Sequence, residues 1–359
     1  HGLKSPFPIK TAFSIAYFFV FFKSGRIFFA KRLAEPGFFD YNREVIFFVN
    51  GNSQSESEKR MKETSPKKKR RWHWGDRSDG YRIRTVNPMT RMMPYIMPQR
   101  ADACNFFADS VDVTKTDRFC REKVRAGMTN FGFLHILIAS YLRAISQRPA
   151  LNRFVSGQKI YSRKGIQIVM VVKKRMAIDS PDTCIKVDFE PDDTVDEVYE
   201  KFNRAVTAVQ NAPDDKNEFD KLNKILSLIP GLFCRWTINL LRFLDYIGLM
   251  PRKILRLSPF HGTMIVTSMG SLGIRPIYHH IYNFGNLPVF FSYGGRRTEV
   301  VCDANGNAST RKTIELKVVT DERICDGYYY ASAFKIIKRH AENPELLEVK
   351  PETVCEDIP

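Results

Sequence analysis

The sequence predicts an α/β protein, a two-layer sandwich in which a large mixed sheet carries helices on one side. Strand-like and helix-like segments alternate along the chain without a strict βαβ repeat. The clearest helix begins at the capping box Thr194–Glu197, after which apolar residues keep helical spacing for about four turns. Near the C-terminus, the alternating strand 314–318 leads through the turn Asp326–Gly327 into another amphipathic helix.

The other elements are expected as follows. Residues 131–148 form a strongly apolar helix that ends before Pro149, and residues 114–125 form a shorter helix ahead of it. β-Branched and aromatic residues predict strands at 106–114, 165–172, 183–189, 264–268 and 289–293, and a hairpin turns at Asn305–Gly306. The globular domain is expected to span residues 81–359.

Composition sets further bounds. At 359 residues the chain can bury one large core or two smaller ones, and 43% hydrophobic residues exclude a disordered protein. The seven cysteines are scattered and form no C-x-x-C pair, which argues against a disulfide framework or a zinc ribbon. We therefore expect a reducing, cytoplasmic location.

Two N-terminal segments differ from the rest. Residues 1–60 hold twelve of the 28 Phe and none of the eleven Met. We interpret this leader as translated sequence upstream of a start at Met61, as a membrane-surface segment, or as a signal peptide. Residues 61–80 form a basic arm with five consecutive Lys and Arg and two Trp between Pro66 and Trp74. The arm is either solvated or a site for nucleic acid or an anionic membrane.

A helical insert is predicted at 219–257, broken at Pro230–Gly231 and closed near Pro251. Such a segment lies on a membrane, covers an apolar substrate, or packs as a helical pair on its own domain. Its apolar residues alternate with five cations, namely Arg235, Arg242, Arg252, Lys253 and Arg256.

Four stretches resemble, in order and spacing, the chloramphenicol acetyltransferase superfamily, which includes the acyltransferase core of 2-oxo acid dehydrogenase complexes. They are the strand 106–113 with Thr114-Lys115, the helix ending at Pro149–Asn152, the run Ser268–Gly273 with Gly285–Pro288, and the strand, loop and helix around Asp326–Gly327. The resemblance implies trimers with active sites between subunits and acyl-CoA as a substrate. Nothing resembles a lipoyl domain or its Pro/Ala-rich linker, so no lipoyl group is expected.

Glu322 stands where the family's H-x-x-x-D-G loop has its catalytic histidine. A thiol gives its proton to an imidazole at a cost of about 3 kcal/mol and to an ordinary carboxylate at about 6 kcal/mol, and burial of a carboxylate narrows this difference. Glu322 is therefore either a remodelled base or a surface carboxylate beside Asp321 and Arg323. The resemblance gives Asp326 a structural role in a pair with an arginine, for which Arg91 is the candidate.

Three histidines are the other candidate bases. His279 and His280 are adjacent in an extended segment, so they point to opposite faces and at most one lines a given pocket. The alternative is one packed and one exposed histidine, and His261 is a weaker candidate. No third ligand has a suitable spacing, so no metal is expected.

The family stabilises the tetrahedral intermediate with a serine or threonine hydroxyl, whose position here is Gly270. Ser268 or Ser271 is therefore expected to substitute. The predicted function is a coenzyme-A-dependent acyltransferase-like protein with a remodelled active site. The alternatives are a non-catalytic trimeric scaffold or acyl-ligand binding protein, and a binder of anionic surfaces or nucleic acid through the basic arm.

Overall fold

The computed structural model describes residues 19–23, 26–30, 72–173, 182–211, 228–302 and 306–357. The chain forms two units, residues 1–59 and 60–359. In the first unit, strands β1 (Phe19–Lys23) and β2 (Arg26–Ala30) pair antiparallel. The remaining predictions for the leader, and those for the basic arm up to residue 71, lie outside the described residues. Within those residues, no helix has both the length and the apolar composition of a membrane span.

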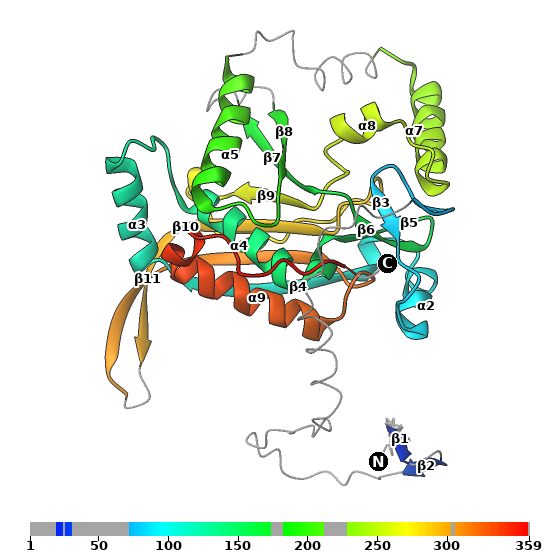
Figure 1. Ribbon diagram of the computed structural model, residues 1–359, viewed down its shortest axis with the longest axis horizontal. Coiled ribbons are helices and arrows are strands. Elements are labelled where there is room, and N and C mark those ends of the chain that lie inside the picture. The colour runs from blue at the N-terminus through cyan, green and yellow to red at the C-terminus, as the bar shows by residue number, and fades with distance from the viewer. Residues whose placement is uncertain are drawn as a thin grey trace, which may run out of the picture. The chain divides into compact units, whose positions relative to one another are not determined.

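The second unit is built on a six-stranded sheet with strand order β4-β11-β10-β9-β7-β8 (Figure 1). β9 is parallel to both of its neighbours, and the other pairs are antiparallel, so the sheet is mixed as predicted. Every strand predicted from alternation is present. The strands are β4 (Cys104–Asp112), β7 (Ile166–Lys173), β8 (Asp182–Phe189), β9 (Met264–Ser268), β10 (Val289–Cys302) and β11 (Ala308–Asp321).

Helices cover one face of this sheet (Figure 1). They are α3 (Thr114–Arg125), α4 (Phe133–Gln147), α5 (Val195–Gln210) and α9 (Gly327–Glu342). α4 is buried on nearly all sides and packs against both α5 and α9, which explains why its sequence is apolar around the whole helix. The main core lies between these helices and inward strand residues such as Ile168, Phe291 and Val318. The predicted fold class is confirmed.

The start of α5 was predicted from its capping box. The Thr194 hydroxyl accepts from the Glu197 N–H at 3.4 Å, and the Glu197 carboxylate accepts from the Thr194 N–H at 2.7 Å, which completes the capping box of α5. The corner after α4 is the 3₁₀ helix η2 (Pro149–Asn152). The other 3₁₀ helices are η1 (Ala101–Ala103), η3 (Gly270–Leu272) and η4 (Pro344–Leu347).

The opposite face of the sheet carries a smaller apolar cluster. Phe290 and Val319 on this face pack with Ile281 and Leu287, which come from the connection between η3 and β10. This connection therefore runs across the sheet on the side away from the main helices. It includes the two adjacent histidines considered as bases.

A second, three-stranded sheet has the order β3-β6-β5. Its strands and the neighbouring helix are β3 (Gly80–Arg82), β5 (Arg153–Ser156), β6 (Lys159–Arg163) and α2 (Pro88–Ile96). The predicted insert contains α7 (Gly231–Tyr246) and α8 (Arg252–Leu257), which begin directly after Pro230 and Pro251. Proline suits a helix start because N–H groups there have no acceptor within the helix, so the missing N–H of proline costs no hydrogen bond.

Candidate active site

The loop 321–327, between β11 and α9, is held by a buried ion-pair cluster. Asp321, the last residue of β11, is fully buried between Arg100 and Arg323, which are 4% and 3% exposed. Arg323 donates through Nε and Nη2 to the two carboxylate oxygens of Asp321, at 2.8 and 2.7 Å. Arg100 Nε lies 3.3 Å from Asp321 Oδ2. We call Arg100, Asp321 and Arg323 the loop cluster.

The guanidinium groups of the loop cluster also tie the loop to other segments. Burial lowers the pKa of Arg100, and Asp321 opposes that effect. The remaining donors find backbone carbonyls, as buried guanidinium groups require. The acceptors are the carbonyl oxygens of Tyr282 and Val155 for Arg100, at 2.7 and 3.3 Å, and those of Met97 and Pro98 for Arg323, each at 3.2 Å.

Glu322 lies between Asp321 and Arg323, which are both buried. Its N–H donates to the Ala103 carbonyl at 2.9 Å, and its side chain is half-buried. Its carboxylate forms no hydrogen bond or ion pair with another described residue. The backbone of Glu322 is therefore fixed on both sides, while its carboxylate is left available.

Asp326 has a different role from the one expected. It is exposed and caps α9, because its carboxylate accepts from the Tyr329 N–H at 2.8 Å. Arg91 donates to the Arg84 carbonyl at 2.7 Å, and no ion pair joins it to Asp326 among the described residues. Asp321, which was not predicted to have a structural role, makes the buried arginine pairs instead.

The histidine pair is arranged as one packed and one exposed ring. His279 is half-buried and stacks on Phe290, with ring centroids 4.3 Å apart, and burial lowers its pKa. His280 is exposed and meets Tyr282 edge-on at 4.8 Å. The same segment reaches the loop cluster through the Tyr282 carbonyl, but no contact links either histidine to Glu322.

The predicted oxyanion donors lie further along the sheet. Ser268 ends β9 opposite Tyr293, whereas Thr320, next to the loop, pairs with Val289. Four residues of strand correspond to about 13 Å, so one chain does not bring Ser268 to Glu322. The Ser271 hydroxyl is exposed and donates to the Ser268 carbonyl at 3.0 Å.

Gly270, at the position of the family serine, lies against another backbone segment. A Cβ on Gly270 would lie 2.8 Å from the Gly294 carbonyl oxygen, so a serine does not fit without a backbone shift. This close approach of the two backbone segments requires a glycine at position 270.

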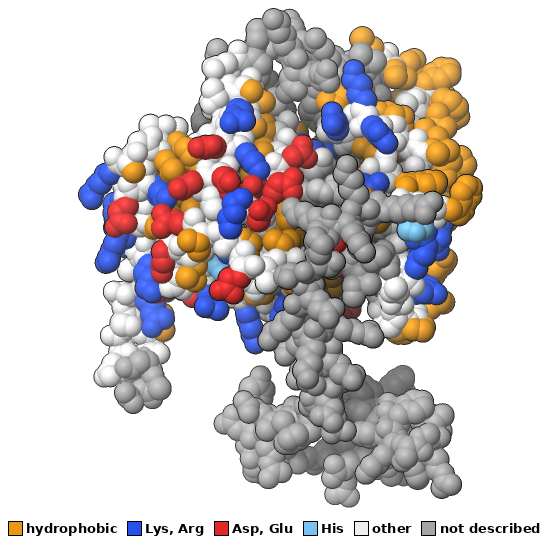
Figure 2. Space-filling view, in the orientation of Figure 1, with side chains coloured by type: hydrophobic (Ala, Val, Ile, Leu, Met, Phe, Trp, Pro, Cys, Tyr) orange, Lys and Arg blue, Asp and Glu red, His pale blue; other side chains and the backbone are white. Residues whose placement is uncertain are grey.

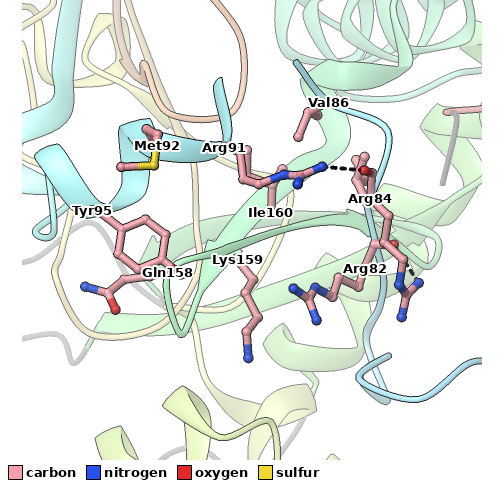
Figure 3. Close-up of a pocket in the computed structure, with 10 residues that line it drawn as sticks. Arg82, Arg84, Val86, Arg91, Met92, Tyr95, Gln158, Lys159 and Ile160 are labelled. Atoms are coloured by element: carbon pink, nitrogen blue, oxygen red, sulfur yellow. Dashed lines mark hydrogen bonds between the residues drawn. The ribbon is translucent and has the colours of Figure 1, made fainter. Parts of the chain in front are cut away.

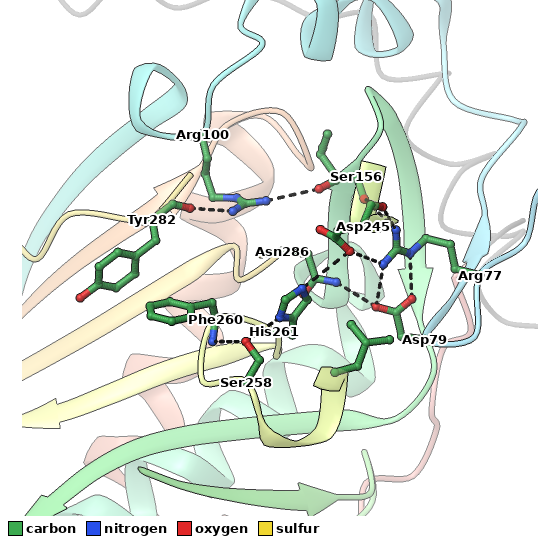
Figure 4. A network of polar contacts seen from close by, with 12 residues as sticks. Arg77, Asp79, Arg100, Ser156, Asp245, Ser258, Phe260, His261, Tyr282 and Asn286 are labelled. Carbon is green, nitrogen blue, oxygen red and sulfur yellow. Dashed lines mark hydrogen bonds and ion pairs between the residues drawn. The ribbon is translucent and has the colours of Figure 1, made fainter. Parts of the chain in front are cut away.

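A second buried network is centred on Arg77 (Figure 4). Arg77 donates to Asp79 Oδ1 at 2.8 Å, to Asp245 Oδ1 at 2.6 Å and to Ser156 Oγ at 2.8 Å. Asn286 donates to Asp79 Oδ2 at 2.9 Å. Because Asp245 belongs to α7 and Ser156 to β5, the network fixes the C-terminal end of α7 to the small sheet.

His261 belongs to this second network. It is 2% exposed, its Nδ1 lies 2.8 Å from Ser258 Oγ, and its Nε2 lies 3.6 Å from Asp245 Oδ1, beyond normal hydrogen-bond length. Burial lowers the pKa of His261, so the ring is neutral at pH 7. We interpret His261 as a packed residue.

Asp245 gives the network a pH dependence. Burial raises the pKa of Asp245, but His261 and Arg77 outweigh burial and bring the pKa from 3.8 to about 2. We attribute most of the lowering to Arg77, because it lies 2.6 Å from the carboxylate whereas His261 Nε2 lies 3.6 Å away. A depressed folded-state pKa means that Asp245 stabilises the fold fully above about pH 5 and loses this contribution as the pH falls towards 2.

We therefore expect Asp245→Asn to destabilise the protein more at pH 5 than at pH 2. The difference in unfolding free energy between wild type and variant should shrink by about 2 kcal/mol over this range. Urea unfolding of both proteins at a series of pH values measures it. If the difference in unfolding free energy between wild type and variant stays constant from pH 5 to pH 2, the pH dependence does not come from Asp245.

Lys186, on β8, is a buried amine that the sequence did not reveal. Its Nζ donates to the carbonyls of Leu255 and Ser258 at 2.8 and 2.6 Å. Burial, assisted by Arg163, lowers its pKa to about 7. Lys186 alternates with the buried residues Ile185 and Val187 of β8, and carbonyls at the end of α8 accept from its amine.

Two adjoining pockets lie beside the loop cluster. The first, of about 450 Å³, is lined by Arg100 and Arg323 and by Arg242 of α7. The second, of about 530 Å³, combines four cations with apolar side chains (Figure 3). Gln158 lines both, which places them side by side. The second pocket is lined by Arg82, Arg84, Arg91 and Lys159 and, on its apolar side, by Ile83, Val86, Met92, Tyr95 and Ile160.

The described residues contain no group of three or more His, Cys, Asp or Glu side chains arranged to hold a metal ion.

No protein-family model and no curated protein sequence matches the chain. Among solved structures, a probable dihydrolipoamide acetyltransferase from Listeria monocytogenes is 15% identical, with 77% of this chain and 99% of that chain covered and a TM-score of 0.48. A truncated catalytic core of the 2-oxoacid dehydrogenase complex from Thermoplasma acidophilum is 14% identical, with coverages of 74% and 99% and a TM-score of 0.45. A chloramphenicol acetyltransferase is 10% identical, with coverages of 72% and 98% and a TM-score of 0.44. These are the groups that the sequence motifs resemble.

Proposed function

We propose that this protein transfers acyl groups from acyl-CoA, with Glu322 as the general base, at a site assembled between two chains. The observation that carries the proposal is the loop cluster, which fixes the residues on both sides of Glu322. A general base must be held in position before the substrate arrives. The loop fixes the backbone of Glu322 in this way, and its half-buried carboxylate is left available to accept a proton.

The two adjoining pockets support an acyl-CoA substrate. Coenzyme A joins phosphate groups to a long, less polar arm, and the pocket of Figure 3 combines four cations with an apolar wall. The adjoining pocket is lined by Arg323, the residue after Glu322 in the loop. In our proposal the phosphates bind the cations, and the thioester extends past Gln158 towards Glu322.

The separation of Ser268 from Glu322 supports a site between chains. Within one chain they are about four strand residues apart, too far to act on the same carbonyl. In a closed trimer, the part of the sheet that carries Ser268 in one chain can approach the loop 321–327 of the next chain. We propose that Ser268 or Ser271 of one chain then acts with Glu322 of its neighbour.

Subunit mixing tests this arrangement. We expect Glu322→Ala and the double variant Ser268→Ala/Ser271→Ala each to lose acyl-CoA turnover. The measurement is the appearance of CoA with a free thiol. When the two are unfolded together and refolded as a mixture, about a quarter of the sites in random trimers should be intact, and activity should return accordingly.

Native mass spectrometry identifies the mixed assemblies in the same samples. An inactive mixture that contains mixed trimers, or an active wild type that is monomeric, would show that the site does not lie between chains. Refolded wild type treated in the same way is the control for recovery.

A further inference from the structure

The outer face of α7 carries large apolar side chains that no described part of the chain covers. Leu232, Phe233, Trp236 and Phe243 are 84%, 65%, 64% and 59% exposed. Their spacing places them along one side of the helix, together with Leu240. Hydrophobic side chains gather at the right edge of Figure 2, where α7 lies in Figure 1, with basic side chains beside them. A contiguous apolar patch of this kind marks an interaction surface.

The charged side chains on the described part of the insert, residues 228–257, are almost all cations. This part contains a single carboxylate, Asp245, and it is turned inward and paired with Arg77. The outer surface of the described part therefore presents cations and no carboxylate. The exposed cations are Arg235, Arg242, Arg252, Lys253 and Arg256.

The insert is held rigidly from its inner side. Besides the Asp245 ion pair, the Tyr246 hydroxyl donates to Gln158 at 2.9 Å, and Leu255 is buried. Lys186 binds carbonyls at the end of α8. The apolar face is thus presented by a fixed platform, so its exposure is a property of the fold.

We propose that the insert, residues 228–257, docks the protein on the surface of an anionic membrane. α7 has 16 residues and is about 24 Å long, so it would lie in the plane of the interface and not cross the bilayer. The Trp, Phe and Leu side chains enter the boundary between headgroups and acyl chains, and the flanking cations bind anionic headgroups. A twofold dimer through this face fits less well, because pairing the same face would bring two sets of five cations together.

Vesicle binding by the full chain tests the proposal. We expect flotation with vesicles of phosphatidylcholine and phosphatidylserine, little flotation with phosphatidylcholine alone, and weaker binding at high salt. In a Trp72→Phe/Trp74→Phe background, Trp236 is the remaining tryptophan. Its emission should shift to shorter wavelength on binding anionic vesicles.

Paired variants separate this surface from the basic arm, which all of them retain. Arg235→Gln/Arg256→Gln should lower the partition coefficient about 30-fold, since each cation contributes roughly a factor of five. Phe233→Ser/Trp236→Ser should lower it about tenfold or more. The controls are Arg121→Gln/Arg204→Gln for charge and Val300→Ser/Tyr328→Ser for exposed apolar side chains elsewhere.

Equal binding by the insert variants and wild type, with no shift of Trp236 emission, would overturn the proposal. So would a fall in assembly mass for Phe233→Ser/Trp236→Ser, because the face would then be a contact between copies. A loss of binding as large in Arg121→Gln/Arg204→Gln would show that only total charge matters, and one as large in Val300→Ser/Tyr328→Ser would show that binding is not specific to the apolar face of α7; either result would overturn the proposal.

Discussion

Replacing Glu322 with alanine is expected to lower acyl-CoA turnover by about 10²–10⁴-fold, the range that a positioned general base contributes. The loop cluster is independent of the Glu322 side chain, so the loop should keep its conformation in the variant. The measurement is CoA release with thiol, amine and hydroxyl acceptors, and Glu352→Ala, at an exposed carboxylate, is the matched control.

The histidine substitution sharpens this test. Glu322→His introduces an imidazole, which accepts a thiol proton at a cost about 3 kcal/mol lower than an ordinary carboxylate. We therefore expect Glu322→His to retain activity where alanine loses it. An active wild type with an equally active alanine variant would exclude Glu322 as the base and favour His279 or His280. A silent wild type with an active histidine variant would favour the non-catalytic scaffold.

Most of the fold could be predicted from the sequence because its signals are local. The capping box of α5, the all-round apolar pattern of α4 and the alternation in β8 each depend on neighbours within a few residues. The order of four such segments was enough to predict the fold class.

The arrangement of the site was harder to predict because it depends on long-range pairing. Arg100 and Asp321 are 221 positions apart, and Arg77 and Asp245 are 168 apart. In the sequence each reads as one surface charge among many, and only the packed structure shows that they are buried. A signal was present at Asp321, which ends a strand directly after the buried residues Val318, Val319 and Thr320.

The orientation of the insert could not be predicted from the sequence either. Its amphipathic pattern was correctly read as helical, but the pattern is the same whether the apolar face packs inward or is exposed. In the structure, the ion pair between Asp245 and Arg77 determines which side of α7 faces the domain.

Asp321→Asn is expected to destabilise the protein by about 3–5 kcal/mol, the cost of leaving buried charges without their partner. The asparagine has nearly the same shape but no charge, so Arg100 and Arg323 would remain buried with carbonyl partners alone. Guanidinium chloride unfolding at a fixed protein concentration measures the change. The midpoint should fall while the slope stays the same, because the surface exposed on unfolding is unchanged.

Asp326→Asn, the same substitution five positions later, is the matched control. Asparagine caps a helix about as well as aspartate, so this variant should change stability by about 0.5 kcal/mol or less. In a double-mutant cycle, Arg323→Gln should cost much less in the Asp321→Asn background than in wild type, because both variants break the same ion pair. Two results would show that the loop cluster does not fix the backbone around Glu322. One is that the effects of the two substitutions on the free energy of unfolding are additive. The other is that Asp321→Asn and Asp326→Asn unfold at the same midpoint. The comparison therefore tests the positioning on which the proposed base depends, without requiring a substrate.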